Sequence, residues 1–204
     1  MLPGRAYNAP MAPRPDPSQG NAVPPRECHR LFFALWPDAT VRRQIADATT
    51  GLAKEQDARG RHLRADRYHL TLQFLGDFAA VPESLIDAAM VAADDVRVDA
   101  FELTLDRAGS FGGARVGWLG PARVPSGLQS LWDELGLALD RHDVPHPSNA
   151  GSAWTPHVTV LRGMRSPLAL AIAPLAWRVR GFVLIRSQPG SAGYAVLQQW
   201  KLGG

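Results

Sequence analysis

One four-residue pattern, histidine–aliphatic–threonine–aliphatic, occurs twice in this chain. It reads "HLTL" at residues 69–72 and "HVTV" at 157–160, so the two histidines are 88 positions apart. Side chains alternate along a β-strand, and each copy therefore sends His and Thr to one face and two aliphatic residues to the other. In the longer stretch "HLTLQFLG", the same alternation puts Gln73 on the His69 face and Phe74 on the opposite one. If two similar halves pack side by side, the two His–Thr faces meet across one cleft.

Two histidines that face one cleft suit acid–base catalysis. The unperturbed pKa of histidine lies near neutral pH, so one imidazole can accept a proton while one imidazolium donates another. Thr71 and Thr159 would supply rigid hydroxyl donors for the oxygens of a phosphoryl group. Arg162 could add guanidinium donors, although strict alternation places it opposite His157, so that it needs a bulge or the strand end to reach the cleft. A single His-x-Thr on a strand is commonplace and has a purely structural interpretation.

Composition and charge indicate a globular protein with a local binding site. The 204 residues are 46% hydrophobic and 20% charged, enough for one domain or two small lobes that share a core. The net charge is +3, and the first 26 residues contribute three arginines against one aspartate, which leaves about +1 for the rest. A field this weak does not argue for broad nucleic-acid binding, so an anionic ligand must be held by a local site.

The chain divides into a tail and one domain. Residues 1–26 hold seven of the seventeen prolines and are expected to form a flexible extension, followed by a single bilobal domain over 27–204. Cys28 is the only cysteine, which excludes a disulfide framework and favours a reducing, cytoplasmic location. We find neither a run of 18 apolar residues nor the apolar core of a secretory signal, so no membrane association is expected.

Periodicity predicts a mixture of helices and strands. Helices are expected after Asp38 as far as Gly60, over residues 81–95, and over about 126–141. Strands are expected at 30–37, 69–76, 100–106, 153–163, 175–187 and 194–203, with one more after the glycine-rich turn in "GSFGGARVGWLG". The last three strands follow one another without long helices between them. This order favours an α+β fold with antiparallel sheets.

Three other groups of residues have competing interpretations. His142 and His146 have the spacing of paired metal ligands on a helix, but Pro145 lies between them and favours a surface loop. A group of arginines before the first motif could guide RNA phosphates toward His69 or could be a charged loop: Arg59, Arg61, Arg64 and Arg67. Three aromatic side chains could stack on a base, although most aromatics are expected in the core: Phe33, Trp118 and Trp154.

Segments along the whole chain after the tail are similar to those of one enzyme family. They resemble, in order and spacing, the two-histidine (2H) phosphoesterases, and within them the bacterial RNA 2′,3′-cyclic phosphodiesterases, also called 2′–5′ RNA ligases. The resemblance covers about residues 29–202 and rests on "RLFFALWPD", "LRADRYHLTLQFLGD", "FELTLDRAGSFGGARVGWLG", "TPHVTVLR" and "FVLIRSQPGSAGYAVLQQWKL". The His-x-Thr-x motifs are weak singly but specific as an ordered pair in this frame.

The resemblance implies a fold, a reaction and a set of site residues. The fold would be α+β, with two pseudo-symmetric lobes, each an antiparallel sheet with packed helices, around a central cleft. The reaction would be hydrolysis of a 2′,3′-cyclic phosphate on an RNA end or nucleotide to a 2′-phosphate, with reverse 2′–5′ ligation, by a monomer without metal or cofactor. By position, His69 would donate a proton to the departing 3′ oxygen and His157 would activate water. The phosphate would be bound by Thr71, Thr159 and Arg162.

Two further functions remain open at the level of sequence. One is a 2H phosphodiesterase that acts on another small cyclic phosphate. The other is a non-catalytic module that binds RNA ends. Both His-x-Thr motifs are intact, which argues against the binding module.

Overall fold

The computed structural model describes residues 28–55, 60–146, 154–188 and 193–203 of the chain. The expected proline-rich extension, residues 1–26, lies outside the described residues. The helices are α1 (Ala39–Glu55), α2 (Glu83–Asp94) and α3 (Ser126–Arg141), with a short 3₁₀ helix η1 (Ala65–Arg67). The strands are β1 (His29–Leu35), β2 (Arg61–His62), β3 (Leu70–Phe78), β4 (Phe101–Phe111), β5 (Val116–Gly120), β6 (Val158–Arg162), β7 (Ala169–Val179), β8 (Gly181–Ser187) and β9 (Tyr194–Lys201). No helix in these ranges is long and apolar enough to cross a membrane.

The strands form one antiparallel sheet made of two matching halves. Its order is β7-β4-β5-β6-β3-β1-β8-β9, with β2 paired to the side of β6. The halves meet at β6 and β3, where a single backbone pair joins Leu70 to Val158. Outward from this seam, β5 and β1, then β4 and β8, then β7 and β9 occupy equivalent places. The predicted α+β class with antiparallel pairing in two similar halves is confirmed, and the halves are continuous through the seam.

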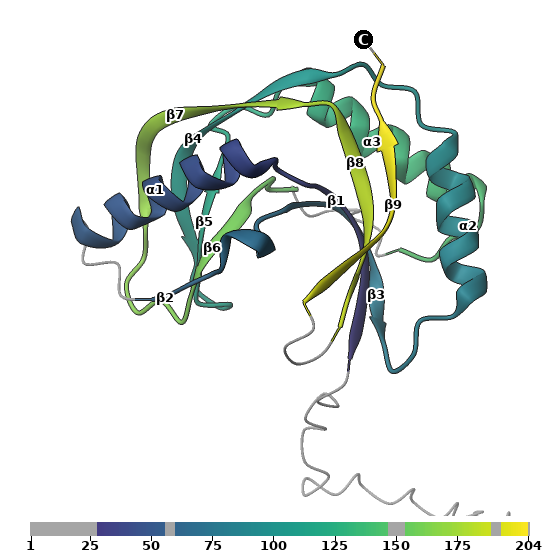
Figure 1. Ribbon diagram of the computed structural model, residues 1–204, viewed down its shortest axis with the longest axis horizontal. Helices are drawn as coiled ribbons and strands as arrows, with labels where there is room; N and C mark the ends of the chain where they lie inside the picture. The colour runs from purple at the N-terminus through teal and green to yellow at the C-terminus, as the bar shows by residue number, and fades with distance from the viewer. Residues whose placement is uncertain (1–27, 56–59, 147–153, 189–192, 204) are drawn as a thin grey trace, which may run out of the picture.

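Helices cover the sheet on both halves (Figure 1). The Asp38 carboxylate accepts hydrogen bonds from the backbone N–H groups of Thr40 and Val41, so it caps α1 as predicted. After leaving β1, α1 crosses to the other half and packs against β6 and β7. The helix α3 packs against β3 and β4, while α2 packs against α3 and β9. The predicted limits of the third helix, 126–141, match those of α3.

Apolar side chains gather on both faces of the sheet. The main core lies between the sheet and the helices and includes Leu70, Val158 and Leu135, all fully buried. A smaller cluster lies on the other face of β1 and β8, where Phe32, Ala34, Val183 and Ile185 are packed with Trp36, Phe74 and Tyr194. Strand alternation explains the division, because Leu31 and Phe33 face the main core while Phe32 and Ala34 face the smaller cluster. This second face carries the two histidines.

One expected strand is two strands. The sequence predicts a single strand over 175–187 because its apolar residues recur along the whole segment, but the segment breaks at Arg180, between β7 and β8. The two parts belong to opposite ends of the sheet order, because β7 pairs with β4 whereas β8 pairs with β1 and β9. The chain therefore passes from one half to the other at Arg180, as the continuous path from β7 to β8 in Figure 1 shows.

A β-bulge interrupts the alternation of β3. In the pairing with β1, Thr71 stands opposite Ala34 and Gln73 stands opposite Phe33, so Leu72 has no partner of its own. An extra residue of this kind moves the following side chains to the other face. The prediction of strict alternation through "HLTLQFLG" is therefore correct as far as Leu72 and wrong for Gln73 and Phe74.

Gln73 consequently faces the helices. Its side chain is buried, and its amide donates a hydrogen bond to the backbone carbonyl of Trp132 in α3, at 3.1 Å. Phe74 takes the place that alternation gave to Gln73 and joins the small cluster on the histidine face. Gln73 thus connects β3 to α3 and has no access to the histidines.

We expect Gln73→Ala to lower stability and leave catalysis intact. The substitution removes a buried hydrogen bond and creates a small cavity, which should reduce the free energy of unfolding by about 1–3 kcal/mol. Urea unfolding measures this loss, with Gln198→Ala on the exposed surface of β9 as the matched control. If Gln73→Ala instead kept full stability and lost turnover, the assigned direction of this side chain would be wrong.

Candidate active site

The two motif histidines lie at the seam between the halves. His69 comes directly before the first residue of β3, and His157 directly before the first residue of β6. Because Leu70 and Val158 are backbone partners across the seam, the preceding histidines start neighbouring strands. The two imidazoles are close enough to interact electrostatically, since a charge on His157 lowers the pKa of His69. The sequence prediction that the two copies come together is confirmed for these strands.

Each imidazole is held by a backbone carbonyl two residues earlier in the chain. The Nδ1 atom of His69 lies 2.8 Å from the carbonyl oxygen of Arg67, and that of His157 lies 2.7 Å from the carbonyl oxygen of Thr155. A carbonyl can only accept a hydrogen bond, so Nδ1 carries the hydrogen in both rings. Nε2 is then the nitrogen that exchanges a proton with a ligand, in the same way on both sides of the seam.

Aromatic rings surround both histidines. The ring of His69 lies 5.0 Å from Phe32, 5.2 Å from Tyr194 and 6.4 Å from Trp36, measured between centroids. The ring of His157 lies 4.9 Å from Phe111 and 6.3 Å from Trp118. These rings cover part of each imidazole with apolar surface, which bears directly on the protonation of both histidines.

Burial lowers the pKa of both histidines. The pKa of His69 is lowered to about 4, chiefly by desolvation and also by the charges of His157 and Arg162, against the opposing effect of the Arg67 carbonyl. Desolvation also lowers the pKa of His157, with the Thr155 carbonyl acting in the opposite sense. Both imidazoles are therefore neutral at neutral pH when the site holds no anion. A bound phosphate would favour the charged forms and raise both pKa values.

A second bulge brings Arg162 to the histidine face. In the pairing of β6 with β5, Thr159 stands opposite Trp118 and Leu161 stands opposite Gly117, so Val160 has no partner. The extra residue moves Arg162 to the face of Thr159, which strict alternation alone would not have allowed. The charge of Arg162 lowers the pKa of both His69 and Tyr194, so the guanidinium acts across the seam.

The two bulges occupy the same place in the two motifs. Leu72 and Val160 each stand three positions after the motif histidine, and each follows the motif threonine. Position five after the histidine is Phe74 in the first copy and Arg162 in the second. The geometry of the repeat is thus shared, while one half contributes an aromatic ring and the other a cation.

The motif threonines have hydroxyl groups available for a ligand. Thr71 and Thr159 lie on the histidine face and are half-buried. Within the described part of the chain, neither hydroxyl hydrogen-bonds to another protein group, whereas Thr49 and Thr50 both bond to their own helix. Two half-buried donors beside two histidines are suited to bind the oxygens of a phosphoryl group.

The candidate arginines and His142 each have a neighbour of their own in the described part of the chain, apart from Arg59. Arg67 lies over the ring of Tyr194 at 5.5 Å, Arg61 pairs with Arg162 across β2 and β6, and Arg64 is engaged by Asp66. Arg59 lies outside the described residues. His142 ends α3 and contacts Asp95 at 2.8 Å. No group of three metal-ligating side chains occurs in the ranges that the structure describes.

Of the three candidate stacking aromatics, one lies beside the site. Trp118 packs on His157, whereas Phe33 is fully buried in the main core, as expected for most of the aromatics, and cannot stack on a ligand. Trp154 stacks on Trp132 at 5.1 Å. Sequence reasoning missed Trp36 and Tyr194, which contact His69. In the sequence, Trp36 is marked only by its position at the end of the predicted strand 30–37, and Tyr194 only by its position at the start of the predicted strand 194–203.

Comparison with known proteins assigns the family. The model of the 2′-5′ RNA ligase superfamily matches residues 36–190. The chain belongs to the 2′-5′ RNA ligase superfamily. Among curated relatives, the RNA 2′,3′-cyclic phosphodiesterase of Escherichia coli (strain K12) is 34% identical over 181 residues, which is 86% of this chain and 98% of the relative. The resemblance stated from the sequence is therefore confirmed.

Solved structures agree with this assignment. E. coli LigT complexed with 3′-AMP matches with a TM-score of 0.68 and 33% identity, covering 87% of this chain and 99% of LigT. A protein of Thermus thermophilus, TT0787, matches with a TM-score of 0.68 and 26% identity, covering 86% of this chain and 98% of that protein. The chain thus shares the fold of both proteins over almost the whole length of each.

Proposed function

We propose that this protein hydrolyses 2′,3′-cyclic phosphate ends of RNA to 2′-phosphates. The observation that carries the proposal is the pair His69 and His157 on adjacent strands at the seam, each with Nδ1 on a backbone carbonyl and Nε2 left for a ligand. The identity with the E. coli RNA 2′,3′-cyclic phosphodiesterase over almost its whole length supports the same reaction here.

In the proposed reaction, each histidine exchanges a proton with one of the two oxygens on opposite sides of the phosphorus: the attacking water and the departing 3′ oxygen. His157 takes a proton from water, whose oxygen forms a new bond to phosphorus. The bond from phosphorus to the 3′ oxygen breaks, and His69 gives a proton to that oxygen. The products are a 3′-hydroxyl and a 2′-phosphate. With a 5′-hydroxyl in place of water as the nucleophile, the same steps join RNA through a 2′–5′ bond, and the 3′ oxygen leaves as before. Run backward, they break that 2′–5′ bond and re-form the cyclic phosphate, with the two roles exchanged.

Thr71, Thr159 and Arg162 bind the phosphate in this proposal. The threonine hydroxyls would donate to its non-bridging oxygens, and the Arg162 guanidinium would balance its negative charge. The bound anion would also restore the proton that His69 lacks in the free protein, because a nearby negative charge raises the pKa of an imidazole. All five groups belong to one chain, so the proposed enzyme is complete as a monomer. The single Cys28 supports a cytoplasmic location.

The first test is turnover without metal. We expect a nucleoside 2′,3′-cyclic phosphate and an RNA that ends in one to be opened in the presence of EDTA, since the two imidazoles supply the proton transfers and Arg162 with the threonine hydroxyls supplies the phosphate contacts in the scheme. Chromatography of the products follows the reaction. Loss of activity with EDTA that Mg²⁺ or Zn²⁺ restores would contradict this mechanism.

The pH dependence should differ between kcat/KM and kcat. The constant kcat/KM reports on the free enzyme, where burial lowers the pKa of both histidines. We therefore expect the optimum of kcat/KM below neutral pH. The constant kcat reports on the substrate complex, where the phosphate raises both pKa values, so the optimum of kcat should lie at higher pH. Initial rates over a pH series give both profiles. Coincident optima above neutral pH would show that desolvation of these histidines does not control the reaction.

A further inference from the structure

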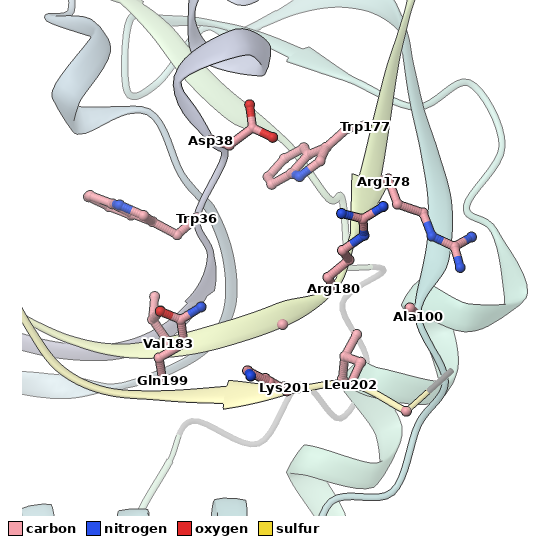
Figure 2. Close-up of a pocket in the computed structure, with 12 residues that line it drawn as sticks. Trp36, Asp38, Ala100, Trp177, Arg178, Arg180, Val183, Gln199, Lys201 and Leu202 are labelled. Atoms are coloured by element: carbon pink, nitrogen blue, oxygen red, sulfur yellow. The ribbon is translucent and has the colours of Figure 1, made fainter.

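A basic pocket lies beside Trp36, away from the histidine seam. Its volume is about 860 Å³, the size of a pocket for a nucleotide-sized ligand. It opens where β7 passes into β8, and it is lined by residues directly after β1, by the end of β7, by β8 and by the end of β9 with the residues that follow it. Figure 2 shows Trp36 and Asp38 on one side of this pocket and Arg180 on the other.

Cations predominate among the charged residues of the pocket. Arg178, Arg180 and Lys201 line it, against the single carboxylate of Asp38. Asp38 is already engaged as the cap of α1, and Arg178 lies 3.4 Å from Glu102 and points away from Trp36 in Figure 2. In the described part of the chain, Arg180 and Lys201 are in no ion pair, and both are exposed. Two uncompensated cations in one concavity form a site for an anion.

Trp36 connects this pocket to the catalytic seam. Its ring is stacked near that of His69, with 6.4 Å between centroids, and it also lines the pocket. A ligand that has its reacting phosphate at His69 can therefore continue past Trp36 toward Arg180 and Lys201. Lys201 lies on β9, in the half opposite Arg162, and Arg180 lies where the chain passes between the halves, so these two cations are separate from the one assigned to the reacting phosphate.

Substrate chemistry decides which part of the RNA extends into the pocket. A 2′,3′-cyclic phosphate uses both the 2′ and the 3′ oxygen of the terminal nucleotide, so the chain continues only through its 5′ oxygen. The next anionic group along the substrate is the phosphodiester on that oxygen. We propose that Arg180 and Lys201 bind the phosphodiester backbone on the 5′ side of the reacting nucleotide, so that the enzyme prefers RNA to mononucleotides. This inference rests on the proposed function.

The test compares two substrates in variants of the pocket. Arg180→Ala and Lys201→Ala should each lower kcat/KM about fivefold for a short single-stranded RNA with a 2′,3′-cyclic end. For a nucleoside 2′,3′-cyclic phosphate, which has no 5′ phosphodiester, each variant should stay within twofold of the unmodified protein. The backbone carbonyl of Arg180 accepts a hydrogen bond from Leu202, and an alanine retains it, so the fold should persist. Arg141→Ala, at the exposed end of α3, is the matched control.

Binding gives a readout that does not depend on turnover. Fluorescence anisotropy with a 5′-labelled RNA that ends in a 2′-phosphate should show weaker affinity in both variants and no change in Arg141→Ala. The slope of log affinity against log salt should fall by about 0.7 for each cation removed. Equal RNA affinity in all four proteins, or equal losses on both substrates, would overturn the inference. If the unmodified protein turned over neither substrate, the proposed function would fail, and the binding data would still decide the role of the pocket.

Discussion

Replacing His69 or His157 by alanine will lower kcat/KM for a 2′,3′-cyclic phosphate by about 10²–10⁴-fold. Each imidazole has Nδ1 fixed by a carbonyl, which leaves Nε2 for one proton transfer, and a transfer of this kind contributes that factor. The double variant should lose far less than the product of the two single losses, because the groups act in one step. Steady-state kinetics on purified proteins measures all three.

A matched histidine outside the site provides the control. His142 also contacts a polar partner, Asp95 at 2.8 Å, but at the end of α3. We expect His142→Ala to leave kcat/KM within twofold of the unmodified protein. Circular dichroism and urea unfolding should show that the His69 and His157 variants remain folded. A folded His69→Ala or His157→Ala enzyme with near-normal turnover would remove the basis of two-histidine catalysis.

Replacing Thr71 or Thr159 by valine will lower kcat by about 10²-fold each. Valine keeps the branched shape but removes the hydroxyl that donates to the phosphate oxygens, and the loss of one such donor has this effect in other enzymes. Because these interactions strengthen as charge develops, kcat should fall more than KM rises. Thr71→Ser and Thr159→Ser keep a hydroxyl and should recover most of the activity.

The control for these variants is an exposed threonine outside the two motifs. Thr104 is exposed on β4, which is separated from the motif strand β6 by β5, and Thr104→Val should not change kcat. Stability measurements separate the two roles of a threonine, since a structural residue would lower the free energy of unfolding without changing kcat of the folded enzyme. An unchanged kcat in both motif valine variants would exclude the threonines from phosphate binding.

Most of what could be predicted about the site from the sequence came from the repeated His-x-Thr-x motif. It located the two histidines, and the helical spacing of leucines located α3 to the residue. The side on which Gln73, Phe74 and Arg162 lie could not be predicted, because a bulge depends on which residues pair across neighbouring strands. Pattern alone could place Arg162 at the site only if a bulge existed, and β6 contains that bulge.

The strands on either side of Arg180 and the aromatic walls were harder to predict for a related reason. Apolar residues recur throughout 175–187, so nothing local marks the point where the chain changes halves. Trp36 and Tyr194 have the composition of core residues, and only the packing of β1 and β9 beside β3 and β8 brings them to His69. Tertiary arrangement, rather than local propensity, determines both features.

The most direct test of the proposed mechanism is the identity of the product. A nucleoside 2′,3′-cyclic phosphate incubated with the enzyme and EDTA can be analysed by phosphorus NMR against the authentic 2′- and 3′-phosphates. Protonation of the 3′ oxygen by one histidine and activation of water by the other predicts the 2′-phosphate alone, formed at least about 10²-fold more slowly with His69→Ala or His157→Ala. The 3′-phosphate, or a mixture of both isomers, would contradict the proposed orientation of the substrate between the two histidines.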